Sequence, residues 1–417
     1  MDKLLILGNN IHVDEIIGLA KKRGIYTIAT DNLPVEKSPV KALADEAWDI
    51  SINDYDLLEK KIIENDINAV ICGASESCLA ANRELCKRLN LPFFCKDRTL
   101  GIVNDKIRFK EECEKCGLRV PKNIFLTPEF NDKDIADINY PVVVKPADGS
   151  SSIGLHICYN KSELISGYMD AYEKSIIKKV VVEEYIHGEQ TGFIFVLQKG
   201  TPILVTSGDD VADINNMERR IFGFSPTKHI DYYKKELFQA IVKLLKRLDC
   251  KQGVVGLQFI TNSHEMVLIE MNYRLPGGKN AAEEIMCMSM LESALGRDID
   301  TKPVLVNDKV FAYAIWLKPG RIKEIQGIDK LRQLIPNFSI QQIKHKEEQI
   351  IENTGMRQLF GFIEIMANID NVEEYIKIIN DFFHVISNTG EDMVIKYRYN
   401  NVERYAEIDM QGVEKNE

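Results

Sequence analysis

The first ninety-odd residues alternate between short apolar segments and longer amphipathic segments, and this alternation restricts the fold more than any other feature of the sequence. The apolar segments are typical of buried strands, and the segments between them have the length and periodicity of helices. Strands that alternate with single helices form βαβ units, in which the strands lie parallel. We therefore predict a parallel βαβ domain over residues 1–96, with strands at KLLILG, IYTIATD, NAVICGA and LPFFC.

The rest of the chain predicts mixed α+β structure. A single connecting helix is expected at 97–121, where Pro121 ends it. Strands around one helix predict a small subdomain at 122–186, and two antiparallel hairpins predict a larger subdomain at 187–303. A C-terminal α+β subdomain is expected at 304–417. The hairpins are expected in FIFVLQKGTPILVTSG and GVVGLQFITNSHEMVLIEM, and the polar segment DDVADINNMERRIFGF between them is expected to form a loop.

Composition excludes several classes of protein. The chain has 417 residues, 28% of them charged, and a net charge of −10, which is typical of a soluble protein with several subdomains. It lacks the clustered lysine and arginine that a general nucleic-acid surface needs. No apolar run approaches the length of a membrane span, and the start MDKLLILGNN lacks the features of a signal peptide. We therefore predict a cytoplasmic protein.

The nine cysteines include one CxxC pair, Cys113 and Cys116, inside a segment with a helical pattern. A zinc site needs further cysteine or histidine ligands at a suitable spacing, and none follows this pair. We therefore expect reduced thiols in place of a structural metal.

The segment VLIEMNYRLPGG begins as an apolar strand and then carries polar residues at every second position. Glu270, Asn272 and Arg274 therefore project from one face of the strand. A turn near residue 263 places Gln258 on the neighbouring strand, and an even register puts it on the same face. The oxygens of Gln258, Glu270 and Asn272 suit Mg²⁺, and Arg274 can hold a phosphate or a carboxylate with two hydrogen bonds. The alternative is a strand end whose polar side chains simply meet solvent.

A second motif joins a strand carrying Lys145 to a loop of small residues, GSSSIG. Glycines let backbone N–H groups approach phosphate oxygens closely, and the hydroxyls of Ser150, Ser151 and Ser152 add donors. A lysine in a strand with a buried pattern needs an anionic partner. The pattern is not a Walker A motif, because no GK[ST] precedes a helix. A plain hairpin loop is the alternative.

The segment KKVVVEEYIHGEQTGF leaves an apolar strand and enters a short polar connector. Between two subdomains, exposed backbone groups at Glu183, Tyr185 and Ile186 would pair with the edge of an adenine ring. Glu189 or Gln190 would then contact the ribose hydroxyls. An interdomain linker with surface acids is the alternative, and the sequence alone leaves both open.

Four motifs, taken in order, resemble those of the ATP-grasp superfamily. They are NDKIRFK with Lys106, VVVKPADGSSSIG with Lys145, VVEEYIHGE with Glu183, and LQFI through IEMNYRLPGG. The resemblance covers about residues 1–300 and, more loosely, the C-terminal part. It implies a parallel βαβ domain followed by a two-subdomain ATP-grasp fold and a C-terminal α+β subdomain.

The resemblance also implies a reaction and the residues for it. ATP would phosphorylate a carboxylate, and an amine would attack the acylphosphate to form an amide or peptide bond. The cofactors would be ATP and Mg²⁺, with Mn²⁺ as a substitute, and Arg274 would stabilise the phosphoryl group in transfer. The metal ligands would be Gln258, Glu270 and Asn272. The nucleotide would contact Lys106, Lys145, Ser150, Ser151, Ser152, Glu183, Glu184, Tyr185, Ile186 and either Glu189 or Gln190.

Two positions depart from the family pattern. Many members carry a glutamate where Gln258 stands, and a glutamine there is similar to the carbamoyl-phosphate synthase large subunit. The number of metal ions is therefore open. The ribose-binding acid of the family usually falls at the position of Gln190, whereas this chain has Glu189 beside it. The ending RLPGG resembles carboxylate–amine ligases related to L-amino acid ligases.

Three functions are compatible with these motifs. The first is an ATP-dependent carboxylate–amine ligase, the second a bicarbonate-using carboxylase or carbamoyl-phosphate-type enzyme, and the third a nucleotide-binding module without catalysis. The ligase reading implies small-molecule carboxylate and amine substrates and no nucleic-acid or membrane partner. The oligomeric state is left open, with a homodimer among the alternatives.

Overall fold

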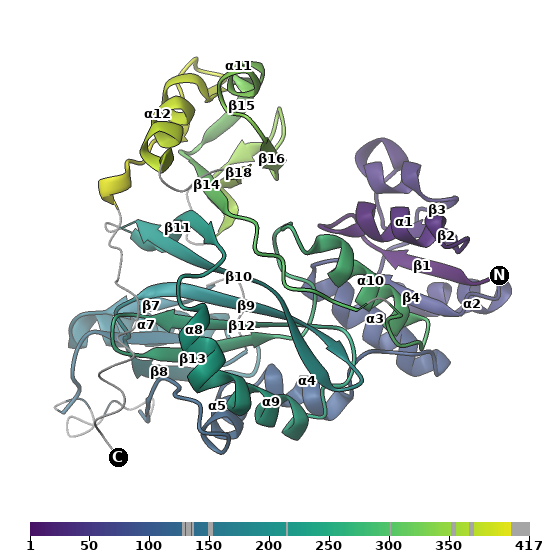
Figure 1. Cartoon of the computed structure of the whole chain (residues 1–417), viewed down its shortest axis with the longest axis horizontal. Helices are drawn as coiled ribbons and strands as arrows, with labels where there is room; N and C mark the ends of the chain where they lie inside the picture. The colour runs from purple at the N-terminus through teal and green to yellow at the C-terminus, as the bar shows by residue number, and fades with distance from the viewer. Residues whose placement is uncertain are drawn as a thin grey trace.

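The computed structural model describes residues 1–126, 130, 135, 137–148, 153–213, 216–300, 302–351, 356–366 and 371–401. The N-terminal domain lies beside the central strands, and the C-terminal strands and helices lie above them (Figure 1). Among the helices in these residues, none has the length and apolar character of a membrane span.

The N-terminal part is the predicted parallel βαβ domain, with strand order β3-β2-β1-β4. The predicted strand at LPFFC is wrong, because this segment packs its aromatic rings into the core instead of pairing: Phe94 contacts Tyr273 edge to face. The edge strand β3 was not predicted. The elements are β1 (Lys3–Leu7), α1 (Val13–Lys22), β2 (Tyr26–Thr30), β3 (Glu46–Trp48), α2 (Tyr55–Glu64), β4 (Ala69–Cys72) and α3 (Glu76–Leu89).

The single connecting helix expected after residue 96 is in fact two helices, α4 (Asp97–Val103) and α5 (Lys106–Glu114). The break falls at Asp105, whose extended backbone starts a new helix. Its carboxylate accepts hydrogen bonds from the backbone N–H groups of Ile107 and Arg108, both at 3.1 Å, and so caps α5. Lys106 is therefore the first residue of α5.

The small subdomain is an antiparallel sheet in the order β5-β8-β6-β7, with α7 packed on one face. Val142, Val144 and Val182 form a small core with α7. Because neighbouring residues of a strand point to opposite faces, Lys145 and Glu183 point away from α7. The elements are β5 (Asn123–Ile124), β6 (Val142–Pro146), β7 (His156–Cys158), α7 (Lys161–Lys174) and β8 (Val180–Glu184).

A nine-stranded sheet runs through the rest of the described chain, in the order β13-β12-β9-β10-β11-β14-β18-β16, with β20 paired to β14. It continues without interruption across the boundary expected at 303/304, because β11 pairs with β14. The strands are β9 (Glu189–Gln198), β10 (Thr201–Asp213), β11 (Asn216–Ser225), β12 (Val254–Thr261), β13 (Met266–Asn272), β14 (Val310–Leu317), β16 (Phe338–Gln342), β18 (Leu359–Met366) and β20 (Val394–Ile395).

The loop expected between the two hairpins is wrong, since most of that segment forms the end of β10 and the strand β11. Ile221, Phe222 and Phe224 of β11 are buried, and β10 and β14 pair with β11 on its two sides. Burial and pairing from distant strands override the local polarity of the segment.

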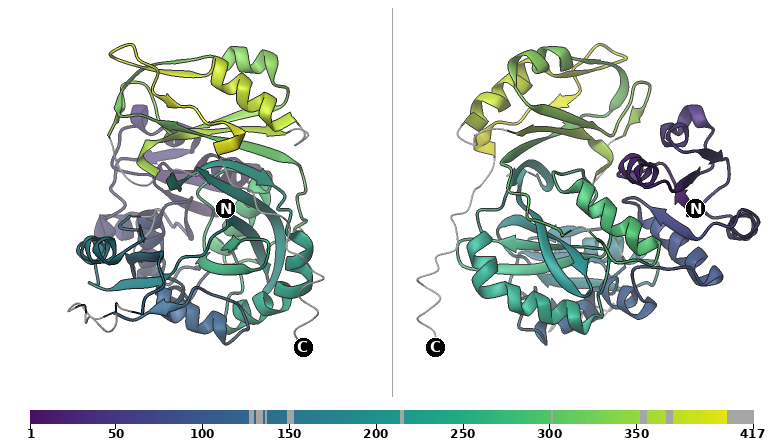
Figure 2. Two further views of the ribbon diagram at one scale, coloured as in Figure 1. Left: turned by 90° about the vertical axis from the view of Figure 1, so that its left-hand side faces the viewer. Right: turned by 45° about the vertical axis from the view of Figure 1, so that its right-hand side comes forward.

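Further helices cover the sheets, and a small separate sheet, β17-β15-β19, completes the C-terminal part above the large subdomain (Figure 2). Helix α10 lies between the N-terminal domain and the large sheet and packs on α1. The remaining elements are α8 (Ile230–Tyr232), a π-helical turn (Tyr233–Leu237), α9 (Phe238–Arg247), α10 (Glu283–Ala294), β15 (Gly320–Gln326), α11 (Ile328–Leu334), β17 (Gln349–Ile350), α12 (Val372–Phe382) and β19 (His384–Ser387), with short 3₁₀ turns at Val35–Lys37, Pro39–Leu43, Met356–Gln358 and Tyr399–Asn401.

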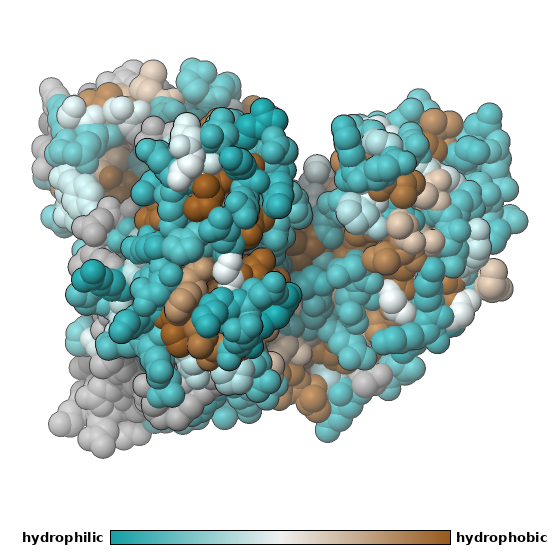
Figure 3. All heavy atoms as spheres, turned by 90° about the horizontal axis from the view of Figure 1, so that it is seen from above, coloured by the Kyte–Doolittle hydropathy of each residue, from teal (hydrophilic) through white to brown (hydrophobic). Residues whose placement is uncertain are grey.

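Two large cores hold the molecule together. The first runs without a break from the N-terminal sheet through α10 to the hairpins β9–β10 and β12–β13. The second lies between the C-terminal strands, from β11 to β18, and the helices α11 and α12. Seen from above, the surface is hollowed between the N-terminal and C-terminal parts (Figure 3).

Candidate functional site

The predicted hairpin brings the three oxygen-bearing side chains together. Gln258 of β12 lies directly opposite Glu270 of β13, and Gly256 lies opposite Asn272. Directly opposed residues share a face, so Gln258, Glu270 and Asn272 lie on one side, while Leu257 and Met271 are buried on the other. The three polar side chains are half-buried. Within the described chain, none of these three side chains makes a hydrogen bond or ion pair with protein.

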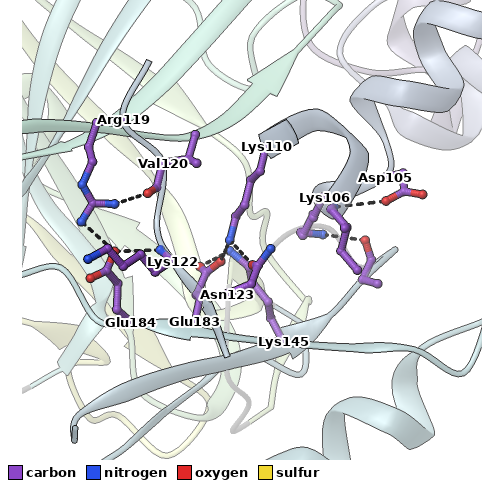
Figure 4. A network of polar contacts seen from close by, with 12 residues as sticks. Asp105, Lys106, Lys110, Arg119, Val120, Lys122, Asn123, Lys145, Glu183 and Glu184 are labelled. Atoms are coloured by element: carbon purple, nitrogen blue, oxygen red, sulfur yellow. Dashed lines mark hydrogen bonds and ion pairs between the residues drawn. The ribbon is translucent and has the colours of Figure 1, made fainter. Parts of the chain in front are cut away.

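Three lysines and one carboxylate form the second half of the site (Figure 4). Lys110 and Lys145 each form an ion pair with Glu183, one lysine to each carboxylate oxygen. Lys110 also donates to the Asn123 side chain at 2.7 Å, and Lys106 donates to the Ala147 carbonyl at 3.4 Å. Lys110 was not among the predicted site residues. Its signal was the i, i+4 spacing from Lys106 in KIRFK, which places both lysines on one face of α5.

The charges of this cluster are unbalanced. The four side chains of the cluster, three ammonium groups and one carboxylate, sum to +2 in a chain whose net charge is −10, and the carboxylates of Glu270 and Asp148 lie within electrostatic reach of Lys106. Burial lowers the pKa of Lys106, and the nearby charge of Lys145 lowers it further, while Glu270 acts in the opposite direction. Burial also lowers the pKa of Lys110. The cluster therefore favours an anionic ligand, which would relieve the repulsion between the lysines.

The structure corrects the expected role of the Glu183 backbone. Residues Glu183 and Glu184 lie in β8, which pairs with β5 on one side and with β6 on the other, so their backbone is not an exposed edge. The Glu184 side chain accepts from Arg119 at 2.6 Å and from the Lys122 N–H at 2.7 Å. Only Tyr185 and Ile186, half-buried just after β8, stay as predicted adenine-binding positions.

The register of β9 separates Glu189 from Gln190. Gln190 pairs with Ile260 and so shares the face of Gln258, two residues away. Glu189 pairs with Thr261 and points to the opposite, buried face, where it meets Lys228 and His229. For a nucleotide bound on the Gln258 face, the prediction that Glu189 contacts the ribose is therefore wrong. Of the two residues, Gln190 is the one that lies on this face.

The remaining predicted residues fall into two groups. Ser150, Ser151 and Ser152 lie outside the described residues. Arg274 forms an ion pair with Glu76 at the start of α3, and it donates to the Leu275 carbonyl at 2.8 Å. Arg274 thus ties the end of β13 to the N-terminal domain.

A row of directly opposed residues, which was not predicted, crosses the large sheet on the Gln258 face. In this row, small residues separate two acids, Asp210 and Glu364. Asp210 is exposed as a whole residue, yet desolvation raises the pKa of its carboxyl group to about 6, and burial raises the pKa of Glu364. The row consists of Ile260, Gln190, Asp210, Gly223, Ala312, Glu364 and Ser339.

A family model of the ATP-grasp domain matches residues 103–278, which include the lysine cluster and the Gln258–Glu270–Asn272 face. The chain carries an ATP-grasp domain. This confirms the resemblance seen in the four sequence motifs. The family match ends at residue 278, inside the Pro-Gly-Gly turn.

Comparison with individual proteins agrees with this assignment. The chain is 24% identical over 289 residues to the 2-oxoglutarate carboxylase small subunit of Hydrogenobacter thermophilus, which covers 66% of this chain and 61% of that one. It is 36% identical over 106 residues to a D-alanine–D-alanine ligase of Bacillus anthracis, covering 25% and 34%. The crystal structure of an L-amino acid ligase from Bacillus licheniformis superposes with a TM-score of 0.74 at 15% identity, covering 93% and 99%. The last likeness confirms the predicted fold class.

Proposed function

We propose that the chain is an ATP- and Mg²⁺-dependent ligase that joins a small-molecule carboxylate to an amine. The observation that carries this proposal is the +2 lysine cluster around Glu183, set within electrostatic reach of Glu270. A polyphosphate is the common biological ligand whose charge suits such a cluster when oxygen ligands for Mg²⁺ stand beside it. The ATP-grasp family match supports ATP as that polyphosphate.

The residues fit Mg²⁺ by their chemistry. Gln258, Glu270 and Asn272 supply hard oxygen atoms on one face and, within the described chain, have no protein partner that would hold them away from a cation. A bound Mg²⁺ would neutralise phosphate oxygens. Lys106 and Lys145 would bind phosphate oxygens directly. Arg274 would hold the group in transfer, or the carboxylate that receives it.

The proposed reaction has two balanced steps. A carboxylate oxygen attacks the γ-phosphorus of ATP, the bond from that phosphorus to the β,γ-bridging oxygen breaks, and ADP leaves. The amine nitrogen then attacks the acyl carbon, phosphate leaves with the former carboxylate oxygen, and an amide and a proton result. The D-alanine–D-alanine ligase and L-amino acid ligase among the similar proteins support an amine as the nucleophile. We propose Tyr185 and Ile186 for adenine and Gln190 for the ribose.

The test is ADP release in the presence of pools of small acids and amines. We expect ADP only when both an acid and an amine are present, and ¹⁸O from a labelled carboxylate should appear in the released phosphate. Release of AMP, or phosphate without ¹⁸O, would contradict the acylphosphate route.

A second candidate is a bicarbonate-dependent reaction, favoured by the similarity to the 2-oxoglutarate carboxylase small subunit. The two candidates separate in one assay, because bicarbonate would then support ADP release without any organic acid. A bicarbonate-independent rate, measured in carbonate-depleted buffer, would favour the amide ligase.

A further inference from the structure

His12 joins the N-terminal domain to the turn that follows the metal-ligand strand. It lies just before α1, its side chain is fully buried, and its backbone has a φ of 76° in the left-handed region. Both ring nitrogens contact residues outside the N-terminal domain. Nδ1 lies 2.7 Å from a carboxylate oxygen of Glu283 in α10, and Nε2 lies 2.9 Å from the carbonyl oxygen of Pro276.

Each ring nitrogen of His12 has its own partner. A carbonyl oxygen only accepts, so Nε2 carries a hydrogen and donates to Pro276. Nδ1 faces the carboxylate of Glu283, which also lies 3.2 Å from the Lys279 ammonium group, and Lys279 in turn lies 2.7 Å from Asp14. His12, Glu283 and Cys287 lie close enough together to hold a metal ion, but both nitrogens of the ring already have protein partners.

The turn held by His12 has few contacts of its own. A Cβ atom at Gly277 would meet nothing within 4 Å, and one at Gly278 would meet only the Gln341 side chain, at 3.9 Å. Arg274 before the turn and Lys279 after it are both paired to the N-terminal domain. His12 is the residue of that domain with a direct hydrogen bond to the backbone of the turn.

The groups facing the turn from the C-terminal strands are hydrogen-bond acceptors. The carbonyl oxygen of the Gln341 amide is buried and, among the described residues, has no hydrogen-bond partner. Gln341 follows Ser339 by two residues on the same face, and Ser339 donates to Glu364 at 3.4 Å. Glu364 is within electrostatic reach of Glu283. Acceptors and carboxylates on this side suit a donor that carries positive charge, such as an ammonium group.

We propose that His12 is a positioning residue that holds the Pro276–Gly278 turn as one wall of the binding site for the amine substrate, with Gln341 and Glu364 on the adjoining wall. The inference rests on the proposed ligase function. The amine would then lie near Arg274, where its nitrogen could reach the acyl carbon of an acylphosphate held by this arginine.

The experiment compares His12→Gln and Glu283→Gln with a matched control, Arg297→Gln. The control breaks another ion pair to the N-terminal domain, Arg297 to Asp2 at 2.7 Å, which does not touch the turn. Hydrogen–deuterium exchange of peptides covering 274–282, without substrates, reports the hold on the turn. Steady-state kinetics reports KM for the amine and for ATP separately.

We expect faster exchange in the turn in the His12→Gln and Glu283→Gln variants and wild-type exchange in the control. KM for the amine should rise about tenfold, while KM for ATP stays within about twofold, as expected when one charged hydrogen bond positions one substrate. Unchanged exchange, or equal changes in the control, would overturn the inference. If the wild type releases ADP and His12→Gln leaves KM for the amine unchanged, this inference alone is overturned. If the wild type releases no ADP, the proposed function is overturned. Should His12→Gln fold poorly, Glu283→Gln carries the test, because it keeps the buried His12 ring and removes the carboxylate that holds this ring against Pro276.

Discussion

Glu183 is the residue on which the lysine cluster depends. Burial alone would raise its pKa, but the charges of Lys145 and Lys110 outweigh burial and hold the pKa below its ordinary value. The Glu183→Gln variant leaves two lysines without their carboxylate, so we expect a loss of about 3–5 kcal/mol in the free energy of unfolding. Lys110→Met in the Glu183→Gln background should restore part of the loss, because it removes one of the unpaired charges. A double-mutant cycle by urea denaturation measures both effects.

The same pair predicts a pH dependence of stability. A carboxylate with a lowered pKa in the folded state contributes stability above its unfolded pKa of about 4.3, and the contribution is lost as pH falls through the folded value. The free energy of unfolding of the wild type should therefore fall more steeply below about pH 4.5 than that of Glu183→Gln. Parallel curves for the two proteins would contradict the assignment.

Glu270 offers a residue-scale test that leaves the fold intact. Its side chain is half-buried and, within the described chain, has no ion pair, so Glu270→Gln should change the melting temperature little. Loss of a carboxylate ligand should raise the Mg²⁺ concentration needed for activity and lower kcat by about a hundredfold or more. Glu265→Gln, on the same hairpin and paired only to Arg119 among the described residues, is the control and should behave as wild type.

Elements built from local signals could be predicted, and those built from distant pairings could not. The hairpin that opposes Gln258 to Glu270 follows from alternation and a turn within one short segment. The segment of β11 was predicted to be a loop because many of its residues are polar. It is a strand because β10 and β14 pair with it on both sides. The row from Gln190 to Glu364 joins strands that are far apart in sequence, so no local pattern encodes it. The face of the sheet to which Glu189 points could not be predicted for a related reason, because it depends on the register between β9 and β12.

Helix α5 gives a prediction at the scale of an element. Its first residue, Lys106, is placed by the Asp105 cap. Asp105→Ala should cost about 1 kcal/mol of stability and loosen the first turn of the helix, so KM for ATP should rise while KM for the amine changes little. Asn104→Ala, one residue outside the cap, is the matched control. A change in amine KM alone would contradict the placement of Lys106 beside the phosphates.

At the scale of the whole molecule, the shared core and the continuous sheet predict cooperative unfolding. One core spans the N-terminal domain and the large subdomain, and the sheet carries on from there into the C-terminal strands. The chain has two tryptophans, Trp48 in the N-terminal sheet and Trp316 in β14, both buried. Single-tryptophan variants, Trp48→Phe and Trp316→Phe, therefore report the two ends of the molecule separately by fluorescence. We expect their urea transitions to coincide after correction for the stability cost of each substitution, because neither end can expose its core without uncovering the large sheet. If the urea transition reported by Trp48 has a lower midpoint than the one reported by Trp316, the N-terminal domain separates first. This separation would release the His12 and Glu76 contacts that hold the segment after β13.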